Sequence, residues 1–492
     1  MAKLRFILYF FLAAATTASF EVPRLTMYDP RYASHHLAGG QALALPAATE
    51  DFESHFYDQT LDHFNYLPES YVTFRQRYVV NSKHWGGPGA PIFAYLGAEA
   101  PLTHNFSAAG SFLIDIAPSF NALLLYIEHR YYGDSIPFGS REEVFGNSSM
   151  LGYMNSQQAI ADYAEIILHI KDQFNASDSP VIVVGGSYGG MLATWFRLKY
   201  PHLAIGALAS SAPILYFDDI TPQDAYLNAV TKDFRDASET CYQTIKKSWA
   251  EIDEIASKPD GLSTLARKFK TCAPLKDSTS LTDQLEGLYA SAAQYNAPPS
   301  YPVTQVCTAI DGPGPNNDTL GRIFAGVVAY YGKKPCYINK PTQPTETYGG
   351  WDWQTCSEMV MPMGYGNDTM FGSKGAFNLT EFSNECRKKY GVAPRPHWVT
   401  TYYGGHSIKR ILKRFGSNII FSNGLKDPYS RGGVLENISD SIHAIYTANG
   451  SHCLDLGASN VTDPEWLIAQ RKEEIHIVHG WLTTYYKDLQ AV

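Results

Sequence analysis

One segment of the chain reads Val181-Ile182-Val183-Val184-Gly185-Gly186-Ser187-Tyr188-Gly189-Gly190. This segment predicts a strand that turns sharply into a helix. The β-branched residues at its start are typical of a buried strand, and the helical pattern from Met191 to Tyr200 stops at Pro201. The glycines around Ser187 have no Cβ atoms, so the turn can close and the serine hydroxyl can project above a sheet. A strand, an abrupt turn and a helix in this order predict an α/β protein that presents this serine at a strand end.

The Gly-x-Ser-x-Gly pattern makes Ser187 the candidate nucleophile. A serine hydroxyl does not lose its proton at neutral pH without a base, so this chemistry needs a histidine that is held by a carboxylate. The backbone N–H of Tyr188 falls at the start of the helix, where it can donate to an oxyanion. The alternative is a glycine-rich turn that only packs a helix on a strand. The strand, the helix and the four glycines around the serine favour catalysis.

The partners of this serine are expected downstream, in the order Ser, Asp, His. The carboxylate candidate is Asp427, which lies just beyond the predicted strand 418–422, where strand-end loops carry chemistry. The histidine candidate is His452, in a loop after the apolar segment 442–446. Asp455 is a rival carboxylate. Asp427 is preferred because it enters from a separate element, whereas Asp455 shares a short loop with His452.

His129 needs a separate explanation, because it precedes Ser187 and the chain order excludes it as the base. It stands between Glu128 and Arg130 beside a predicted strand. We expect His129 to be structural and its two charged neighbours to pair with each other in support of the turn. A role for these charges in binding a charged substrate terminus is the alternative.

Short apolar strands alternate with helical patterns in two parts of the chain. The predicted strands are 92–96, 122–127, 181–184, 207–210 and 418–422, and a helix is predicted over 156–174. This alternation predicts a mainly parallel sheet that is covered by helices. We expect the first part of this domain at 51–213, its second part at 396–492, and a mainly helical, disulfide-linked cap inserted at 214–395.

Two helical features carry more specific expectations. A helical stretch over 225–256 lies within the predicted cap. The last helix of the chain starts at Thr462-Asp463-Pro464-Glu465, which predicts a capping box with proline in the first turn.

The two ends of the chain and its net charge limit the class of protein to which it can belong. Residues 1–19 carry Lys3 and Arg5, an apolar run and small residues, which predicts a signal peptide. A membrane anchor is the alternative, but the apolar run is shorter than the ~20 residues that span a bilayer. Residues 20–50 lack a clear period and predict a pro-segment or a loose arm. The formal net charge of −9 argues against a nucleic-acid partner, and no later segment predicts a membrane anchor after signal removal.

Six of the seven cysteines fall between 241 and 386, which predicts disulfides confined to one region and one thiol left over. A zinc site is the alternative, but no Cys-x-x-Cys or His-x-x-x-His pattern accompanies them, so we expect no metal and no cofactor. Nine Asn-x-Ser/Thr sequons favour a glycosylated surface. These sequons start at Asn105, Asn147, Asn175, Asn317, Asn367, Asn378, Asn437, Asn449 and Asn460.

Five motifs occur in order across most of the chain. They are Glu128-His-Arg-Tyr-Tyr-Gly-Asp-Ser135, Gly185-Gly-Ser-Tyr-Gly-Gly190, Ser211-Ala-Pro213, Phe421-Ser-Asn-Gly424 with Asp427-Pro428, and Ser451-His-Cys-Leu-Asp455. Together they resemble the serine peptidase family of lysosomal Pro-X carboxypeptidase (prolylcarboxypeptidase) and dipeptidyl peptidase II. The resemblance runs from about Phe56 to the C-terminus and implies an α/β-hydrolase fold with an inserted helical cap. It implies a catalytic triad of Ser187, Asp427 and His452.

The same resemblance implies finer features. The implied disulfides are Cys241–Cys307, Cys272–Cys336 and Cys356–Cys386, which leaves Cys453 unpaired. The implied proline-accepting subsite is lined by Met191, Met361 and Tyr429, whose soft apolar and aromatic surfaces suit a pyrrolidine ring. Ordinary core packing is the alternative for the two methionines. Two departures touch this subsite, since Tyr429 stands where family members often have Trp, and Gly97-Ala-Glu-Ala100 stands where they often have Gly-Asn-Glu-Gly.

We therefore predict a serine-type exopeptidase that cleaves the bond after proline in peptides and releases a C-terminal residue through an acyl-enzyme. The segments around Ser187 and at 358–362 resemble the carboxypeptidase more closely than a dipeptidyl aminopeptidase that releases X-Pro, and this resemblance favours the carboxypeptidase. An esterase or lipase with the same triad and a catalytically silent glycoprotein that binds peptides are further alternatives. The predicted route is the secretory pathway, to the cell exterior or to a vacuole or lysosome. The predicted partner is a proline-containing peptide, and a homodimer is one candidate state of assembly.

Overall fold

The computed structural model describes residues 51–102, 110–313, 318–338, 346–372 and 375–491. The predicted signal peptide and the arm at 20–50 lie outside these residues, as do the sequons at Asn105 and Asn317. The other seven sequon asparagines are exposed. None of the helices in the described ranges combines the length and the apolar character of a membrane span.

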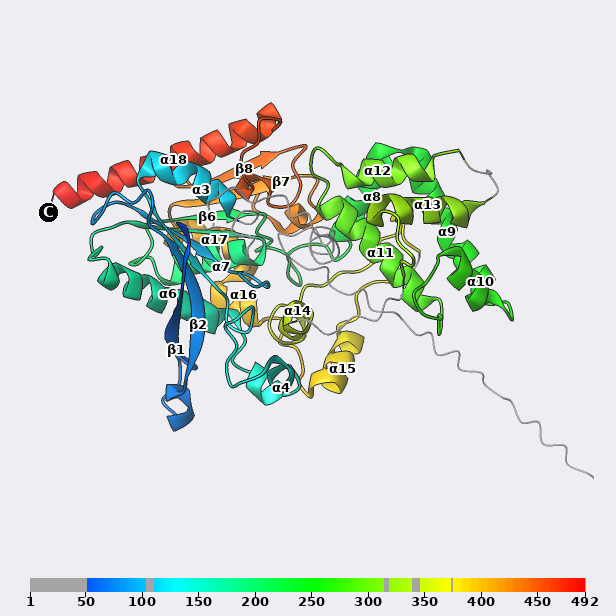
Figure 1. Ribbon diagram of the computed structural model, residues 1–492, viewed down its shortest axis with the longest axis horizontal. Helices are drawn as coiled ribbons and strands as arrows, with labels where there is room; N and C mark the ends of the chain where they lie inside the picture. The colour runs from blue at the N-terminus through cyan, green and yellow to red at the C-terminus, as the bar shows by residue number, and fades with distance from the viewer. Residues whose placement is uncertain (1–50, 103–109, 314–317, 339–345, 373–374, 492) are drawn as a thin grey trace, which may run out of the picture.

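An eight-stranded sheet organises the molecule (Figure 1). Its strands follow the order β1-β2-β4-β3-β5-β6-β7-β8. β1 and β2 pair antiparallel, as do β2 and β4, and every neighbouring pair from β4 to β8 is parallel. The bounds are β1 Glu53–Thr60, β2 Thr73–Asn81, β3 Ile92–Leu96, β4 Leu123–Ile127, β5 Val181–Gly186, β6 Gly206–Ser210, β7 Ile419–Gly424 and β8 Ile442–Thr447. The topology confirms the predicted α/β-hydrolase fold class.

The central strands form where continuous apolar runs predict them. Every residue of β3, β4, β5, β6 and β7 is buried, because helices cover both faces of the sheet and these strands have no solvent side. The sequence reasoning did not predict β1 and β2. β1 lies at the sheet edge and most of its residues are exposed or half-buried, so it has no apolar run to mark it.

Helices cover both faces of the sheet (Figure 1). One face packs against α3 and α18, and there Trp481 shares a core with Phe93 of β3. The other face packs against α6 and α7, and there Trp195 shares a core with Ala94 of the same strand. Successive strand residues point to opposite faces, so neighbours in β3 belong to different cores. The bounds are α3 Ser111–Phe120, α4 Arg141–Phe145, α5 Ser148–Leu151, α6 Ser156–Gln173, α7 Tyr188–Lys199 and α18 Glu465–Gln490.

The chain between β6 and β7 is mainly helical, and Figure 1 shows α8 to α13 grouped at one end of the molecule beside the sheet. The bounds are α8 Ala225–Ala237, α9 Glu239–Ala256, α10 Gly261–Lys268, α11 Thr279–Gln294, α12 Pro302–Ile310, α13 Thr319–Tyr331, α14 Glu346–Ser357, α15 Leu379–Tyr390, α16 Trp398–Tyr403 and α17 Ile408–Phe415. The stretch predicted over 225–256 is two helices, because Ser238 is extended and its hydroxyl accepts from the N–H of Cys241 to start α9.

Three disulfides stabilise this helical region. They join Cys241 to Cys307, Cys272 to Cys336, and Cys356 to Cys386. These are the pairs that the family resemblance implies, and Cys453 is left free and buried. The first bridge links α9 to α12 and the third links α14 to α15, so helices that are distant in sequence are held together covalently.

The capping box predicted before the last helix is wrong. α18 begins at Glu465 with Pro464 as its N-cap, and no side chain caps it. Thr462 instead donates its N–H and its hydroxyl to Oδ1 of Asn460, at 3.0 and 2.8 Å. Asp463 accepts a 2.6 Å hydrogen bond from Arg471. These polar groups are satisfied within the turn and by the helix side chain, so none is left to cap the helix.

Candidate active site

The turn at Ser187 is a strained junction between β5 and α7. Ser187 has φ 61° and ψ −123°, a conformation that L residues rarely adopt. A Cβ atom at Gly185 would lie 2.1 Å from the carbonyl oxygen of Gly189, and one at Gly190 would lie 2.8 Å from the carbonyl oxygen of Ser210. The glycines are therefore required because the backbone of the turn approaches itself and β6 too closely for a side chain.

Three side chains from separate elements meet at this turn. Nε2 of His452 lies 2.8 Å from Oγ of Ser187, and Nδ1 of His452 lies 2.6 Å from Oδ2 of Asp427. The second carboxylate oxygen of Asp427 accepts a 3.0 Å hydrogen bond from the backbone N–H of Tyr429. All three side chains are buried. The structure thus brings the predicted serine, histidine and aspartate together in one continuous hydrogen-bonded chain.

The sheet explains why these residues meet. Ser187 follows β5, Asp427 follows β7 and caps the short 3-10 helix η4 (Pro428–Gly432), and His452 lies in the loop after β8. β5, β6, β7 and β8 are parallel neighbours, so their carboxyl ends lie at one edge of the sheet. Residues that are far apart in sequence therefore reach a common point.

The charge of His452 is governed by its surroundings. Burial, the largest single effect, disfavours the charged imidazole, but the interactions with Asp427 and Cys453 together raise the pKa of His452 well above its usual value. In the neutral ring, the bond to the carboxylate keeps the proton on Nδ1 and leaves Nε2 free to accept a proton from Ser187. The adjacent thiol of Cys453 stays protonated, because burial raises its pKa.

Asp455, the rival carboxylate, has a different partner. Its Oδ1 accepts a 2.6 Å hydrogen bond from Oγ of Ser210 at the end of β6. Nearby, Oε1 of Glu474 in α18 accepts a 2.7 Å bond from Oγ of Ser422 in β7. Both carboxyls are buried, and burial raises the pKa of each, with the negative charge of Asp455 raising that of Glu474 further. Asp427, and not Asp455, is therefore the residue bonded to His452.

α7 begins at Tyr188, so the backbone N–H of Tyr188 lies in the first turn. The N–H groups of a first turn have no acceptor within the helix. Its side chain is held from two sides. Nε2 of Gln354 donates to its hydroxyl at 2.9 Å, and Nε2 of His129 lies 3.2 Å from the same oxygen. Burial lowers the pKa of His129 to about 4, so this ring is neutral at ordinary pH. His129 supports the turn, as expected from its place in the chain.

The loop after β3 also reaches the first turn of α7. A Cβ atom at Gly189 would lie 2.8 Å from the carbonyl oxygen of Leu96 and 3.5 Å from Cβ of Ala98. In this fold the loop after the third strand supplies a second oxyanion donor, and the N–H groups of Ala98 and Glu99 are the candidates here. The Gly-x-Ser-x-Gly pattern points to Tyr188 alone, although the place of Ala98, two residues after a predicted strand, is a signal for the second donor.

Glu128 and Arg130 do not pair with each other, so that expectation is wrong. The Arg130 guanidinium is fully buried and lies 2.5 Å from the carboxylate of Asp162 in α6. Glu128 accepts hydrogen bonds from the N–H of Leu102 and the hydroxyl of Ser135. Each of these two buried groups interacts with residues that only the packing of the chain brings near. Glu128 and Arg130 therefore do not pair, although they are close in sequence.

The helical region contacts the site directly. The backbone N–H of His452 donates to the carbonyl oxygen of Gln294 at the end of α11, at 3.0 Å. The ring of Tyr295 stands edge-on to the imidazole, with 6.0 Å between centroids. The hydroxyl of Tyr226 in α8 donates to the Gln294 side chain at 3.2 Å. The position of the His452 loop therefore depends on the inserted helices, which local sequence patterns around His452 could not indicate.

The three residues predicted to line a substrate pocket are Met191, Met361 and Tyr429, and all are buried in one hydrophobic cluster. Tyr429 lies beside the triad, with its ring centroid 5.9 Å from that of His452 and 4.8 Å from that of Tyr226. The two methionines are 0% and 1% exposed, which fits core packing. In the part of the chain that the structure describes, no three His, Cys, Asp or Glu side chains gather to hold a metal ion.

The fold and the site together define a serine hydrolase. An α/β-hydrolase sheet presents a serine on a strained turn, this serine is hydrogen-bonded to a histidine, and the histidine is hydrogen-bonded to an aspartate. Residues 59–474 match the family described as Serine carboxypeptidase S28. The chain belongs to this family, and the protein is a serine peptidase.

Relatives in this family span nearly the whole chain. Lysosomal Pro-X carboxypeptidase of Mus musculus is 38% identical over 502 residues, which covers 98% of this chain and 98% of that one. The Homo sapiens protein of the same name is 37% identical over 462 residues, covering 90% of this chain and 91% of that one. Thymus-specific serine protease of Homo sapiens is 30% identical over 478 residues, covering 90% of each chain.

Proposed function

We propose that this protein is a Pro-X carboxypeptidase, a serine exopeptidase that cleaves the bond after proline and releases the residue that follows it. The observation that carries this proposal is the hydrogen-bonded chain from Ser187 through His452 to Asp427 in a member of the serine carboxypeptidase S28 family. The relatives named Lysosomal Pro-X carboxypeptidase, at 37% and 38% identity, support the substrate class.

Ser187 starts the proposed reaction. Its Oγ attacks the carbonyl carbon of the prolyl residue while Nε2 of His452, 2.8 Å away, accepts the hydroxyl proton. Asp427 holds the other ring nitrogen and stabilises the imidazolium that forms. Negative charge develops on the carbonyl oxygen near the start of α7, where the N–H of Tyr188 and one from the Ala98 loop can donate to it.

His452 then gives its proton to the leaving amine, which departs as the free C-terminal residue. The peptide that ends in proline stays on Ser187 as an ester. A water molecule gives one proton to His452 and attacks the ester carbonyl, and the shortened peptide leaves as its acid. The proton returns to Ser187, so each turnover consumes one water and restores the enzyme.

Proline is recognised, in this proposal, by Met191, Met361 and Tyr429. The support is strongest for Tyr429, whose ring lies beside His452 and whose backbone N–H is bonded to Asp427. An aromatic face next to the reacting carbonyl suits the flat, apolar pyrrolidine ring, and thioether side chains can adapt around it.

We propose a hydrolase domain at 51–213 and 396–492 and a cap at 214–395. The helical character of the chain between β6 and β7, with all three disulfides, supports this division. The hydrogen bond from His452 to Gln294 supports a cap that covers the site. A covered site admits the end of a peptide more readily than the middle of a long chain, which favours removal of a terminal residue.

The compartment is part of the proposal. Three disulfides and seven exposed sequon asparagines fit a glycoprotein of the secretory pathway. The relatives whose names include "lysosomal" support delivery to a lysosome or vacuole. A homodimer stays a prediction, which light scattering of the purified protein can test.

Product analysis on a peptide with an acetylated N-terminus and a Pro-Phe end tests this function. We expect release of free Phe, because a carboxypeptidase needs only the free C-terminus. Two matched peptides serve as controls, one with Ala in place of Pro and one with an amidated C-terminus, and both should be cut far more slowly.

Other outcomes identify the alternatives. Release of X-Pro from a peptide with a free N-terminus, with the acetylated peptide left intact, would establish a dipeptidyl aminopeptidase instead. Hydrolysis of p-nitrophenyl esters without cleavage of any proline peptide would establish an esterase.

A further inference from the structure

One helix outside the candidate active site carries a concentrated positive charge. α17 has the sequence Ile-Lys-Arg-Ile-Leu-Lys-Arg-Phe over residues 408–415. Its four cations are Lys409, Arg410, Lys413 and Arg414, and all are exposed. A Lys-Arg pair that recurs after four residues places the lysines in one row along the helix and the arginines in the neighbouring row, because a helix has 3.6 residues per turn. These two rows together are the basic face of α17. This basic face stands out in a chain whose formal net charge is −9.

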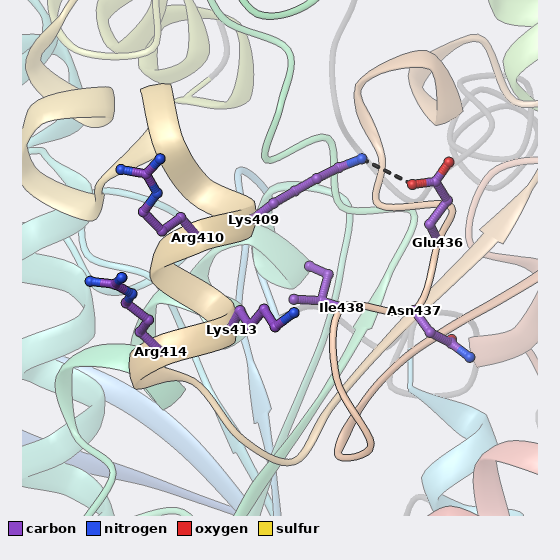
Figure 2. Close-up of a pocket in the computed structure, with 7 residues that line it drawn as sticks. All are labelled: Lys409, Arg410, Lys413, Arg414, Glu436, Asn437 and Ile438. Carbon is purple, nitrogen blue, oxygen red and sulfur yellow. Dashed lines mark hydrogen bonds and ion pairs between the residues drawn. The ribbon is translucent and has the colours of Figure 1, made fainter.

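The basic face borders a surface hollow of about 650 Å³, whose other wall is the segment 436–438. Figure 2 shows Lys409 and Lys413 extending toward that segment, and Arg410 and Arg414 extending side by side in the other direction. Nζ of Lys409 lies 3.2 Å from the carboxylate of Glu436. Among the described residues, the other three cations have no ion-pair partner.

The fold itself does not account for these charges. Lys409 repels Lys413 and Arg410 repels Arg414, because like charges four residues apart destabilise a helix. The helix dipole favours cations in the last turn, where Lys413 and Arg414 lie, but disfavours them in the first turn, where Lys409 and Arg410 lie. These cations destabilise the helix, and few ion pairs within the protein offset this cost. We therefore expect the surface to bind a partner molecule.

We propose that the basic face of α17 binds a sulfated polysaccharide. Short segments rich in Lys and Arg are typical of surfaces that bind heparin-like chains. Sulfate groups repeat along such a chain, as the cations repeat along α17. The planar guanidinium groups of Arg410 and Arg414 can each hold two sulfate oxygens. The proposal is independent of the peptidase specificity, because it uses none of the active-site residues.

Other polyanions fit this surface less well. An anionic membrane is bound by a helix that inserts an apolar face, but Ile408 and Leu412 are buried in the protein core and only Phe415, in the last turn, is strongly exposed. Nucleic acid is disfavoured by the net charge of −9 and by the secretory route that the disulfides fit.

The test uses the full-length glycoprotein and immobilised heparin, with the dissociation constant measured at several salt concentrations. The variant is Arg410→Ser with Arg414→Ser, and the matched control is Lys333→Ser with Lys334→Ser, which removes two exposed cations just beyond the end of α13. We expect the α17 variant to bind about twenty-five-fold more weakly, which is about fivefold for each of the two cations lost from a polyanion surface. The control variant should bind like the wild type. Equal affinity of the α17 variant and the wild type would overturn the proposal.

Three further comparisons sharpen the test. Hyaluronan, which has carboxylates but no sulfates, should bind at least tenfold more weakly than heparin, and equal binding would refute recognition of sulfate. Binding should persist at pH 5, because Lys and Arg stay charged there, and loss at pH 5 would point to histidines instead. Tighter binding to phosphatidylserine vesicles than to heparin would also contradict the proposal.

A glycan attached at the sequon Asn437, which lies at the rim of the hollow, would be another source of anions at this surface. The measurement is therefore repeated after enzymatic removal of N-glycans. Retained or stronger heparin binding supports α17 as the binding surface, and loss of binding would contradict the proposal. Thermal unfolding and peptide cleavage by both double variants, expected to match the wild type, show that the variants are folded.

Discussion

Nδ1 of His452 and Oδ2 of Asp427 lie 2.6 Å apart, and both side chains are fully buried. A carboxylate this close fixes the orientation of the imidazole and favours its charged form. Asp455, three residues after the histidine, is engaged with Ser210 and offers no such contact. The histidine therefore depends on a residue that arrives from another strand, and the same dependence should be visible in its pH behaviour.

Asp427→Asn removes the charge that raises the pKa of His452. We expect kcat/KM to fall by about 10³–10⁴-fold, because the amide no longer holds the ring in the tautomer that accepts a proton from Ser187. The base acts only when neutral, so activity is lost as the pH falls through its pKa. Without the carboxylate this pKa is lower, and the acid limb of the residual activity should move to lower pH. A pH–rate profile measures both effects.

Asp440→Asn, at an exposed position, is the control and should leave the pH–rate profile unchanged. An unmoved acid limb in the Asp427 variant would contradict the assignment.

Ser187→Ala should fold and be glycosylated normally while losing at least about a thousandfold in turnover. Alanine can occupy the same strained turn, because its Cβ needs no more space than that of serine. A fluorophosphonate probe should label the wild type at Ser187 and leave the variant unlabelled. Full peptidase activity in the variant, with an unchanged melting temperature, would rule out Ser187 as the nucleophile.

The buried pair Asp455 and Glu474 should make stability depend on pH. Burial raises the pKa of both carboxyls, so each binds its proton more tightly in the folded than in the unfolded chain. Their contribution is complete below the unfolded-state pKa of about 4 and is lost as the pH rises through the folded-state value. Glu358 and Asp233, whose pKa burial raises to about 7, act in the same direction. These groups favour the folded state in an acidic compartment.

Glu474→Gln tests this directly, because the amide is neutral at every pH. We expect the melting temperature of the variant to fall less steeply than that of the wild type between about pH 5 and pH 8. Glu473→Gln, which changes the exposed neighbour on the same helix, should leave the slope unchanged. Identical slopes for the wild type and the Glu474 variant, measured by differential scanning fluorimetry, would show that this carboxyl does not titrate as described.

The thiol of Cys453 should be unreactive in the folded protein. It is 5% exposed, and burial raises its pKa, so little nucleophilic thiolate forms or meets solvent. A thiol reagent such as dithionitrobenzoate should detect no thiol in the native chain and one per chain in guanidinium chloride, because the other six cysteines form disulfides. Rapid modification of the native protein would indicate that the His452 loop opens readily.

Local chemistry made part of this protein predictable. The turn at Ser187 was recognisable because glycines on either side of a serine after a β-branched run have a steric purpose that does not depend on the rest of the chain. Asp427 was preferred over Asp455 because parallel strands deliver their loop residues to one edge. The capping box at Thr462 failed for the opposite reason, since the same polar side chains found nearer partners once the chain had folded.

By itself, the sequence determined the buried strands, the strained serine turn and the order in which the catalytic candidates follow one another, because these depend on residue type and short-range spacing. Tertiary structure alone decided that Arg130 pairs with Asp162, that the antiparallel strands β1 and β2 join the sheet, and that the His452 loop is hydrogen-bonded to Gln294. Such contacts join residues that are distant in sequence, and their geometry exists only after the sheet, its covering helices and the inserted helical region have packed together.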